Sequence, residues 1–263
     1  MTYTHGHAES VLRSHRARTA ANSASYLLPR LQPTDRLLDV GSGPGTITAD
    51  LARLVAEVVA VEVTEDAAAL TRAELARQGV TNAEVRVADV HALGLADDEF
   101  DVVHAHQVLQ HVADPVGALR EMARVTGPGG VLAVRDSDYA AFAWYPRLPG
   151  LDRWLALYQA AARANGGEPD AGRHLLAWAH AAGLTDVTAS SSTWCFATPE
   201  TRAWWGGMWA DRVTGSALAE QLVREDRATR ERLGELAEVW RAWAADPDGW
   251  ILIPHGELVI RRG

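Results

Sequence analysis

The segment LLDVGSGPG, residues 37–45, limits the fold of this chain more than any other part of the sequence. A short apolar stretch predicts a buried strand over 36–40, which runs directly into three closely spaced glycines and a predicted helix. Glycines leave backbone N–H groups uncovered, and the start of a helix adds the positive end of its dipole. We therefore expect an α/β fold in which backbone atoms face a ligand at the carboxyl end of this strand.

Strands and helices are expected to alternate through the first half of the chain, and this rhythm changes after residue 135. A β-branched run such as 58–63 is typical of a parallel strand that is covered on both faces. The pattern predicts a doubly wound, mostly parallel, seven-stranded sheet with helical insertions. Predicted strands are 36–40, 58–63, 85–88, 100–105, 131–134 and 186–196, with a terminal strand or hairpin over 250–260, and predicted helices are 8–31, 46–54, 64–79, 114–127, 151–164, 173–182 and two or more within 199–245.

Composition excludes several classes of protein. The chain has 263 residues, of which 48% are hydrophobic and 22% charged, as in ordinary globular proteins. The net charge of −9 disfavours a nucleic-acid partner, and no apolar run reaches the roughly 18 residues of a membrane span. The first residues lack the apolar core of a secretory signal, so we expect a cytoplasmic protein. The sequence permits a homodimer.

Metal and lysine chemistry are also disfavoured. The single cysteine, Cys195, can form neither an internal disulfide nor a cysteine-based metal site. His104 and His106 form an i, i+2 pair without a third ligand nearby in the sequence, so no metal is predicted. All 25 residues counted as Lys+Arg are arginine, which removes any lysine base or Schiff base.

Two acidic residues at the ends of the next strands indicate the kind of ligand. The dinucleotide motif G-x-G-x-x-G would require glycine where this chain has Thr46, which disfavours a dinucleotide oxidoreductase. Glu62 ends the second predicted strand, where a carboxylate can accept hydrogen bonds from both hydroxyls of a ribose. Asp89 follows the third strand and can accept from an exocyclic adenine amine. Together with the glycine turn, these positions predict an adenosyl ligand, whereas the glycines alone would also suit a tight turn without one.

Three stretches carry a resemblance to a known family: LLDVGSGPGTIT, VVAVEVTED and VADVHALGLADDEFDVVHAHQVLQHVADPVGALREMARVTGPGGVLAV. They cover about residues 36–135 and resemble the class I S-adenosylmethionine-dependent methyltransferases, most of all the small-molecule branch related to ubiquinone and menaquinone biosynthesis. The resemblance implies a Rossmann-like fold with S-adenosyl-L-methionine as cofactor. It also implies methyl transfer, by in-line displacement, to an O, N or C atom of a small aromatic or apolar molecule.

The resemblance assigns cofactor contacts at the strand ends. The backbone of Gly41 and Gly43 would pass close to the methionine part, Asp39 would orient the turn or meet the amino group, and Glu62 would hold the ribose. The implied cofactor residues are Asn22, Tyr26, Asp39, Gly41, Ser42, Gly43, Glu62, Val63, Asp89, Val90 and His106.

Candidate catalytic and acceptor-binding residues follow the fourth and fifth strands and the tryptophan-rich second half. His106, His111 and Asp138 are the candidate catalytic residues, with His255 as a further candidate base. All ten tryptophans lie at or after residue 144, and most have helical spacings that suit packing between helices. A sharper interpretation is an aromatic pocket, whose ring faces attract a sulfonium. Its predicted members are Tyr139, Trp144, Tyr145, Trp205 and Trp209.

The resemblance also implies a domain plan, in which residues 1–263 form a single methyltransferase domain. Residues 1–35 would form an N-terminal helical cap, 36–135 the cofactor-binding core, and 139–182 with 197–247 a helical substrate lid. Two alternatives use the same cofactor site: an enzyme with a non-methylating outcome such as cyclisation or decarboxylation, and a non-catalytic partner protein that binds the cofactor. Product analysis separates the first alternative. An open route from Trp144 to the sulfonium would favour an enzyme, and a blocked route would favour the second alternative.

Overall fold

The computed structural model describes residues 9–263, with side chains from residue 12 onward. Internal contacts divide the chain into two compact units. Unit 1 comprises, among the described residues, 9–14, Asp138–Asp170 and Thr193–Pro254. Unit 2 comprises His15–Ser137, Ala171–Ser192 and His255–Gly263. The first eight residues of the predicted cap 1–35 lie outside the described part.

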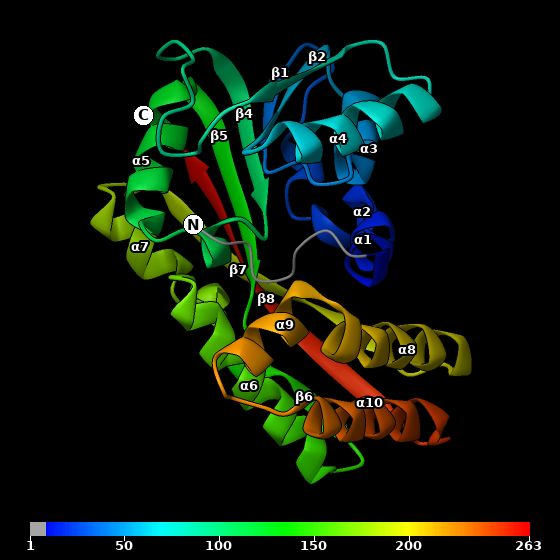
Figure 1. The fold of residues 1–263 in the computed structure, drawn as a ribbon. Coiled ribbons are helices and arrows are strands. Elements are labelled where there is room, and N and C mark those ends of the chain that lie inside the picture. Colours follow the sequence, from blue (N-terminus) through cyan, green and yellow to red (C-terminus); the bar gives the residue numbers. More distant parts are fainter. Residues whose placement is uncertain (1–8) are drawn as a thin grey trace. The chain divides into compact units, whose positions relative to one another are not determined.

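Unit 2 is built on a mostly parallel sheet, which confirms the predicted fold class (Figure 1). Five parallel strands follow the order β3-β2-β1-β4-β5, and residues 255–261 of β8 run antiparallel to β5. Val40 pairs with Val61 and with Ala105, so that three strands end at the same edge. The strands are β1 (Arg36–Val40), β2 (Glu57–Glu62), β3 (Ala83–Val87), β4 (Phe100–His106), β5 (Thr126–Ser137) and β8 (Trp250–Arg261).

Helices bury both faces of this sheet. One face packs its alternate apolar residues under α5 (Pro115–Val125) and α7 (Leu175–Ala181). The other face packs under α2 (Ala20–Ser23) and α3 (Thr46–Ala52), while α4 (Glu65–Arg77) lies against α3 and β3. The 3-10 turns are η1 (Leu28–Arg30), η2 (Leu109–His111) and η4 (Ala171–Arg173). The edge that remains for chemistry is the carboxyl edge of the parallel strands.

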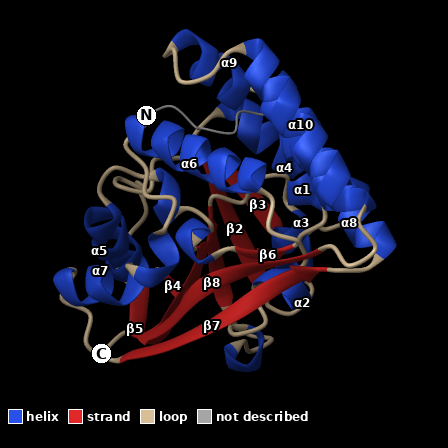
Figure 2. Cartoon of the chain, turned by 90° about the horizontal axis from the view of Figure 1, so that it is seen from below, coloured by secondary structure: helices blue, strands red, loops and turns tan. Residues whose placement is uncertain are grey.

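Unit 1 is mainly helical and has a core of its own. Figure 2 shows α8 and α10 side by side, with α6 packed on α10. The helices are α6 (Pro149–Ala164), α8 (Pro199–Gly215), α9 (Ala217–Arg224) and α10 (Arg230–Ala245), preceded by η3 (Tyr139–Ala141). Their contacts bury Trp154, Trp209, Trp240 and Trp243, of which the last three have no exposed surface. This agrees with the packing interpretation of the helically spaced tryptophans.

Two further strands complete the sheet. β6 (Ala143–Tyr145) pairs with the start of β8, where Tyr145 lies opposite Trp250. β7 (Val187–Phe196) pairs with β8 and carries the exposed thiol of Cys195.

Two expectations about elements are corrected by the structure, and the open choice between a terminal strand and a hairpin is decided. The helix expected over 8–31 is interrupted: α1 (Glu9–Arg16) ends, and Thr19 starts α2 with a capping box completed by Asn22. The terminal segment is one continuous strand and not a hairpin. The sheet has eight strands instead of seven, because the short β6 joins it. Internal contacts place residues 171–182, the last part of the predicted lid segment 139–182, in unit 2. The lid role of 139–182 and 197–247 stays a prediction.

In the part of the chain that the structure describes, every helix is too short or too polar to cross a bilayer.

Candidate functional site

The glycine turn between β1 and α3 has the backbone that only glycine adopts without strain. Gly41, Gly43 and Gly45 have φ angles of +71°, +56° and +84°. A Cβ atom at Gly41 would lie 2.5 Å from the Val108 side chain, whereas a Cβ at Gly43 would meet no atom within 4 Å. The turn is therefore packed at its start and open at Gly43, where a ligand can approach the backbone.

Helix α4 holds this turn from the side. The Thr71 hydroxyl donates to the Gly43 carbonyl at 2.7 Å and lies 2.9 Å from the Ser42 hydroxyl. Ser42 itself is buried, so its side chain supports the turn from within. Thr71 was not among the predicted site residues, because helical periodicity gives no sign that one threonine reaches back to the turn.

Glu62 lies beside the open glycine, as its strand-end position predicts. Its carboxylate accepts from the Gly43 N–H at 2.5 Å and from the Val63 N–H at 3.2 Å. A carboxylate has about four acceptor positions, so it can also accept from hydroxyl groups of a ligand. Val63 is 63% exposed, so its apolar surface is free to meet a flat ring.

Asp89 follows β3 on the same side of the sheet. It accepts from the His91 N–H at 2.9 Å and lies 2.7 Å from His91 Nδ1. The hydrogen bond from the His91 backbone is the main cause that lowers the pKa of Asp89, and the His91 ring adds to it. The Asp89 carboxylate is therefore ionised at neutral pH. The Asp89 side chain is 60% exposed, whereas the neighbouring Val90 is buried in the core.

The Asp39 side chain points into the protein, and its carboxylate contacts two other side chains. One carboxylate oxygen accepts from the Thr48 hydroxyl at 2.6 Å, and the other lies 2.9 Å from His104 Nδ1. Both Asp39 and His104 are buried. Asp39 thus ties β1 to α3 and to β4, while its role toward the glycine turn and the cofactor stays a prediction.

A buried ion pair lies further along the same face. Arg135 of β5 contacts Glu257 of β8 at 3.1 Å, and Ser190 and Ser192 of β7 hydrogen-bond the Glu257 carboxylate. Burial lowers the pKa of Arg135 to about 10, a value at which the guanidinium is still charged at neutral pH. Sequence reasoning missed this pair, because the two residues are 122 positions apart.

The two candidate catalytic histidines of unit 2, His106 and His111, both have a lowered pKa. Burial, followed by the positive charge of Arg18, lowers the pKa of His106 well below its ordinary value. The same two causes lower the pKa of His111 to about 3. Both rings are therefore neutral at physiological pH and are weak proton acceptors. His106 stacks on His255 with ring centroids 6.3 Å apart.

Tyr26 and Asn22 have different surroundings at the N-terminal side of unit 2. The Tyr26 hydroxyl is buried and has no hydrogen-bond partner among the described residues. Burial is the main cause that raises its pKa well above 10, so it stays protonated. Asn22 is exposed, accepts from the Thr19 N–H at 2.9 Å and completes the cap of α2.

The remaining candidates belong to unit 1. Tyr139 and Trp205 are nearly buried and Trp209 is fully buried in the unit 1 core, while Trp144 is half-buried and Tyr145 is 58% exposed. The Trp205 ring stacks on Phe196 with centroids 4.5 Å apart. Asp138 is buried, and its N–H donates to the Pro254 carbonyl. Core packing accounts for Trp209, and the acceptor-pocket role of all these residues stays a prediction.

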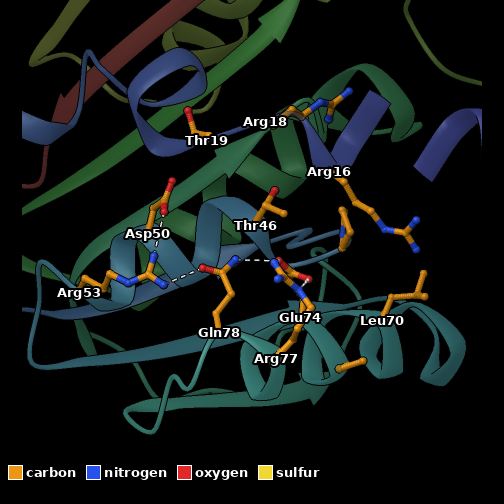
Figure 3. Close-up of a pocket in the computed structure, with 12 residues that line it drawn as sticks. Arg16, Arg18, Thr19, Thr46, Asp50, Arg53, Leu70, Glu74, Arg77 and Gln78 are labelled. Carbon is orange, nitrogen blue, oxygen red and sulfur yellow. Dashed lines mark hydrogen bonds and ion pairs between the residues drawn. The ribbon is translucent and has the colours of Figure 1, made fainter. Parts of the chain in front are cut away.

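A separate cavity of about 720 Å³ is lined by residues of α3 and α4 and by Arg16, Arg18 and Thr19 (Figure 3). Pro44 and Thr46 of the glycine turn line it, but none of the predicted cofactor residues does. Along one wall, Arg53 donates to Asp50 and to Gln78, and Arg77 donates to Glu74. These side chains satisfy one another, so the wall is a polar surface network. The described residues contain no cluster of three or more His, Cys, Asp or Glu suited to a metal ion.

Comparisons with known proteins identify the family of this chain. A family model described as "Methyltransferase domain" matches residues 31–183. The uncharacterized methyltransferase C1B3.06c of Schizosaccharomyces pombe is 35% identical over 272 residues, covering 99% of this chain and 96% of that protein. A ubiquinone biosynthesis O-methyltransferase of Xanthomonas axonopodis is 34% identical over 122 residues, covering 45% of this chain and 51% of that protein.

A solved structure shares the fold. Phosphoethanolamine N-methyltransferase 2 of Haemonchus contortus, in complex with S-adenosylhomocysteine, is similar with a TM-score of 0.60 at 14% identity. The match covers 96% of this chain and 57% of that chain.

Proposed function

The chain belongs to the class I S-adenosylmethionine-dependent methyltransferases, and we propose that it methylates an O, N or C atom of a small molecule by in-line displacement. The cofactor is S-adenosyl-L-methionine. The observation that carries the proposal is the open glycine turn beside Glu62, at an edge where three parallel strands end together.

The residues at this edge fit an adenosyl group with an amino-acid tail. The open side of Gly43 admits a ligand against the backbone, Glu62 has acceptor positions for ribose hydroxyls, and the exposed carboxylate of Asp89 can accept from an adenine amine. When bound, S-adenosylmethionine supplies an electrophilic methyl carbon and departs as a neutral thioether. The chain has to hold the acceptor in line and exclude water, which can contribute about 7–11 kcal/mol.

The acceptor we propose is a small aromatic or apolar molecule. Tyr139, Trp144, Tyr145, Trp205 and Trp209 are the proposed sources of an aromatic wall, which suits flat acceptors. If the acceptor carries a weakly acidic proton, His106, His111, Asp138 and His255 are the candidate bases. The lowered pKa values of His106 and His111 make these two rings weak bases, because a base works best when its pKa is near the working pH. A cytoplasmic enzyme and a homodimer also belong to this proposal.

Calorimetry with S-adenosylhomocysteine tests the cofactor half of the proposal. We expect binding, and we expect Glu62→Ala to weaken it by about 1–3 kcal/mol, since a charge-assisted contact is lost. Unchanged affinity would remove Glu62 from the site.

A screen of candidate acceptors with isotope-labelled S-adenosylmethionine, followed by mass spectrometry, tests the acceptor half. Labelled methyl on a small-molecule product is the expected result. Trp205→Ala should then impair acceptor use more than cofactor binding, whereas equal loss of both would indicate a packing role.

A further inference from the structure

The turn that follows β3 holds the carboxylate of Asp89 at one of its two oxygens. The Ala92 N–H donates to the Asp89 carbonyl at 2.9 Å, which closes the turn. Within it, the His91 N–H donates to Asp89 Oδ1 at 2.9 Å, and Nδ1 of the His91 ring lies 2.7 Å from the same oxygen. No group among the described residues donates to Oδ2, so this oxygen is left for a ligand.

The other nitrogen of the His91 ring is held as well. His91 Nε2 lies 3.1 Å from the Asp114 carbonyl, which also accepts from the Ala118 N–H in the first turn of α5. A carbonyl oxygen has two lone pairs, so it can accept both hydrogen bonds. The ring therefore connects the turn after β3 to the start of α5, across 23 positions of the chain.

The chemistry of the two partners decides which atoms donate. The His91 N–H, and then the His91 ring, lower the pKa of Asp89, so this carboxylate is ionised at neutral pH and has no proton to give. Nδ1 is therefore the donor of its contact. The Asp114 carbonyl is likewise only an acceptor, so the ring makes both contacts at once when each nitrogen carries a proton.

Such a support matters at this position because the Asp89 side chain is 60% exposed. An exposed aspartate is free to change rotamer, and a ligand that needs one rotamer has to order the side chain on binding. A neighbour that already holds the side chain removes part of this cost. With Oδ1 held by His91, Oδ2 is presented to a ligand in one direction.

We propose that His91 is a positioning residue for the cofactor, which holds Asp89 so that Oδ2 accepts from the exocyclic amine of adenine. This inference rests on the proposed function, in which Asp89 meets that amine. It adds a source of specificity, because a purine with an oxo group in place of the amine offers the carboxylate an acceptor and no donor. Among the described residues, His91 is the side chain that donates to Asp89.

Two ligands isolate the contact with the amine in a calorimetric test. S-adenosylhomocysteine carries the amine, whereas S-inosylhomocysteine has an oxo group in its place. The wild-type protein should bind S-adenosylhomocysteine about tenfold more tightly, in the range for a hydrogen bond to a charged group. His91→Ala should weaken S-adenosylhomocysteine about fivefold, within the cost of ordering one side chain, and should change S-inosylhomocysteine by less than about twofold.

Two further variants test whether the effect belongs to the ring nitrogen. His91→Asn places an amide N–H near the position of Nδ1, so it should recover most of the affinity that His91→Ala loses. His180→Ala removes an exposed histidine of α7, also in unit 2, and is the matched control that should leave both affinities unchanged. A loss in His91→Asn as large as in His91→Ala would overturn the proposal, as would equal losses for the two ligands in His91→Ala.

A double-mutant cycle tests whether His91 acts through Asp89. Asp89→Ala should by itself remove the preference for S-adenosylhomocysteine, and the addition of His91→Ala should then change the affinity by less than about twofold. Losses that multiply in the double variant would contradict a positioning role.

The same measurements separate this inference from the proposed function. Equal binding of the two ligands by the wild-type protein would contradict the contact of Asp89 with adenine, and the role of His91 with it. A preference that disappears in Asp89→Ala and persists in His91→Ala would contradict the role of His91 alone.

Discussion

Asp136 shows how much one buried carboxyl can shape the response of this protein to pH. It is fully buried at the end of β5, and one of its oxygens accepts from the Gln110 N–H at 3.0 Å. Burial raises its pKa to about 7, against the opposing effects of the Gln110 and Leu109 N–H groups and of the charges on Arg135 and Arg18. Between about pH 4 and pH 7 the folded state therefore binds a proton that the unfolded chain does not. This stabilisation is present in acid and is lost as the pH rises through 7.

The variant Asp136→Asn removes this titration and keeps a neutral side chain with an acceptor oxygen. The free energy of unfolding of Asp136→Asn, relative to wild type, should rise by about 2–3 kcal/mol between pH 5 and pH 9. His106 and His111 titrate in both proteins, so their contribution cancels in the comparison. Urea unfolding at a series of pH values measures the difference. If the difference in the free energy of unfolding between Asp136→Asn and wild type did not change with pH, Asp136 would be ionised over the whole pH range.

Among the helices and strands, the contact between α4 and the glycine turn links the stability of the fold to the binding of the ligand. Thr71→Val keeps the shape of the side chain and removes the hydroxyl that reaches Gly43 and Ser42. We expect it to lower the free energy of unfolding by about 1–3 kcal/mol and to weaken S-adenosylhomocysteine, because a buried carbonyl loses its donor. Thr214→Val, on exposed α8 surface, is the matched control and should change stability by less than about 0.5 kcal/mol. Similar effects of the two substitutions would argue against a specific role for Thr71.

The first glycine of the turn, Gly41, leads to a second prediction about the packing between elements. Gly41→Ala adds a Cβ atom 2.5 Å from Val108 and strains a φ of +71°, so it should cost about 2 kcal/mol or more. Val108→Ala in the same chain should recover part of this loss, because it removes the atom in conflict. Gly43→Ala has strain but no clash and should cost less. Additive effects of Gly41→Ala and Val108→Ala in urea unfolding would show that the two residues do not interact.

The sequence predicts a helix or strand well where the signal for that element lies within its own residues. Apolar β-branched runs identified the parallel strands. The predicted helix starts at 64 and 114 are confirmed, since the Thr64 and Asp114 side chains cap these helices by accepting from the Ala67 and Gly117 N–H groups. The expected helix over 8–31 was wrong, because the apolar period persists across the break that the Thr19 cap introduces. Periodicity reports which face is buried and is insensitive to a change of helix axis.

The polar interior of unit 2 could not be predicted in the same way. His104 and Asp39 are 65 positions apart, and their contact exists only because β4 lies beside β1. Residues at strand ends, such as Glu62, were accessible to prediction, since the glycine turn fixes where a ligand enters. Residues inside a strand, such as His104 and Arg135, look like ordinary core positions until the neighbouring strand is known.

For the whole molecule, the division into two units with separate cores has a measurable consequence. Of the ten tryptophans, Trp178 lies within unit 2 and the other nine lie in the ranges of unit 1. With Trp178→Phe, tryptophan emission reports on unit 1 alone, while hydrogen exchange of β1 and β2 amides reports on unit 2. S-adenosylhomocysteine at about 100 times its Kd should stabilise unit 2 by about 2.7 kcal/mol.

We expect this ligand to shift the unfolding midpoint seen by exchange and to leave the tryptophan transition in place, because the proposed cofactor residues all belong to unit 2. A single transition that moves as one in both signals would show that the units unfold together.

The exposed Cys195 on β7 is the sole cysteine of the chain. A maleimide dye would therefore attach at one known point of the native protein, with no residue replaced. Indole emission from the tryptophan core of unit 1 could then be followed by energy transfer to that dye. The protein thus carries its own donor and its own attachment point for an optical assay of the folded state of unit 1.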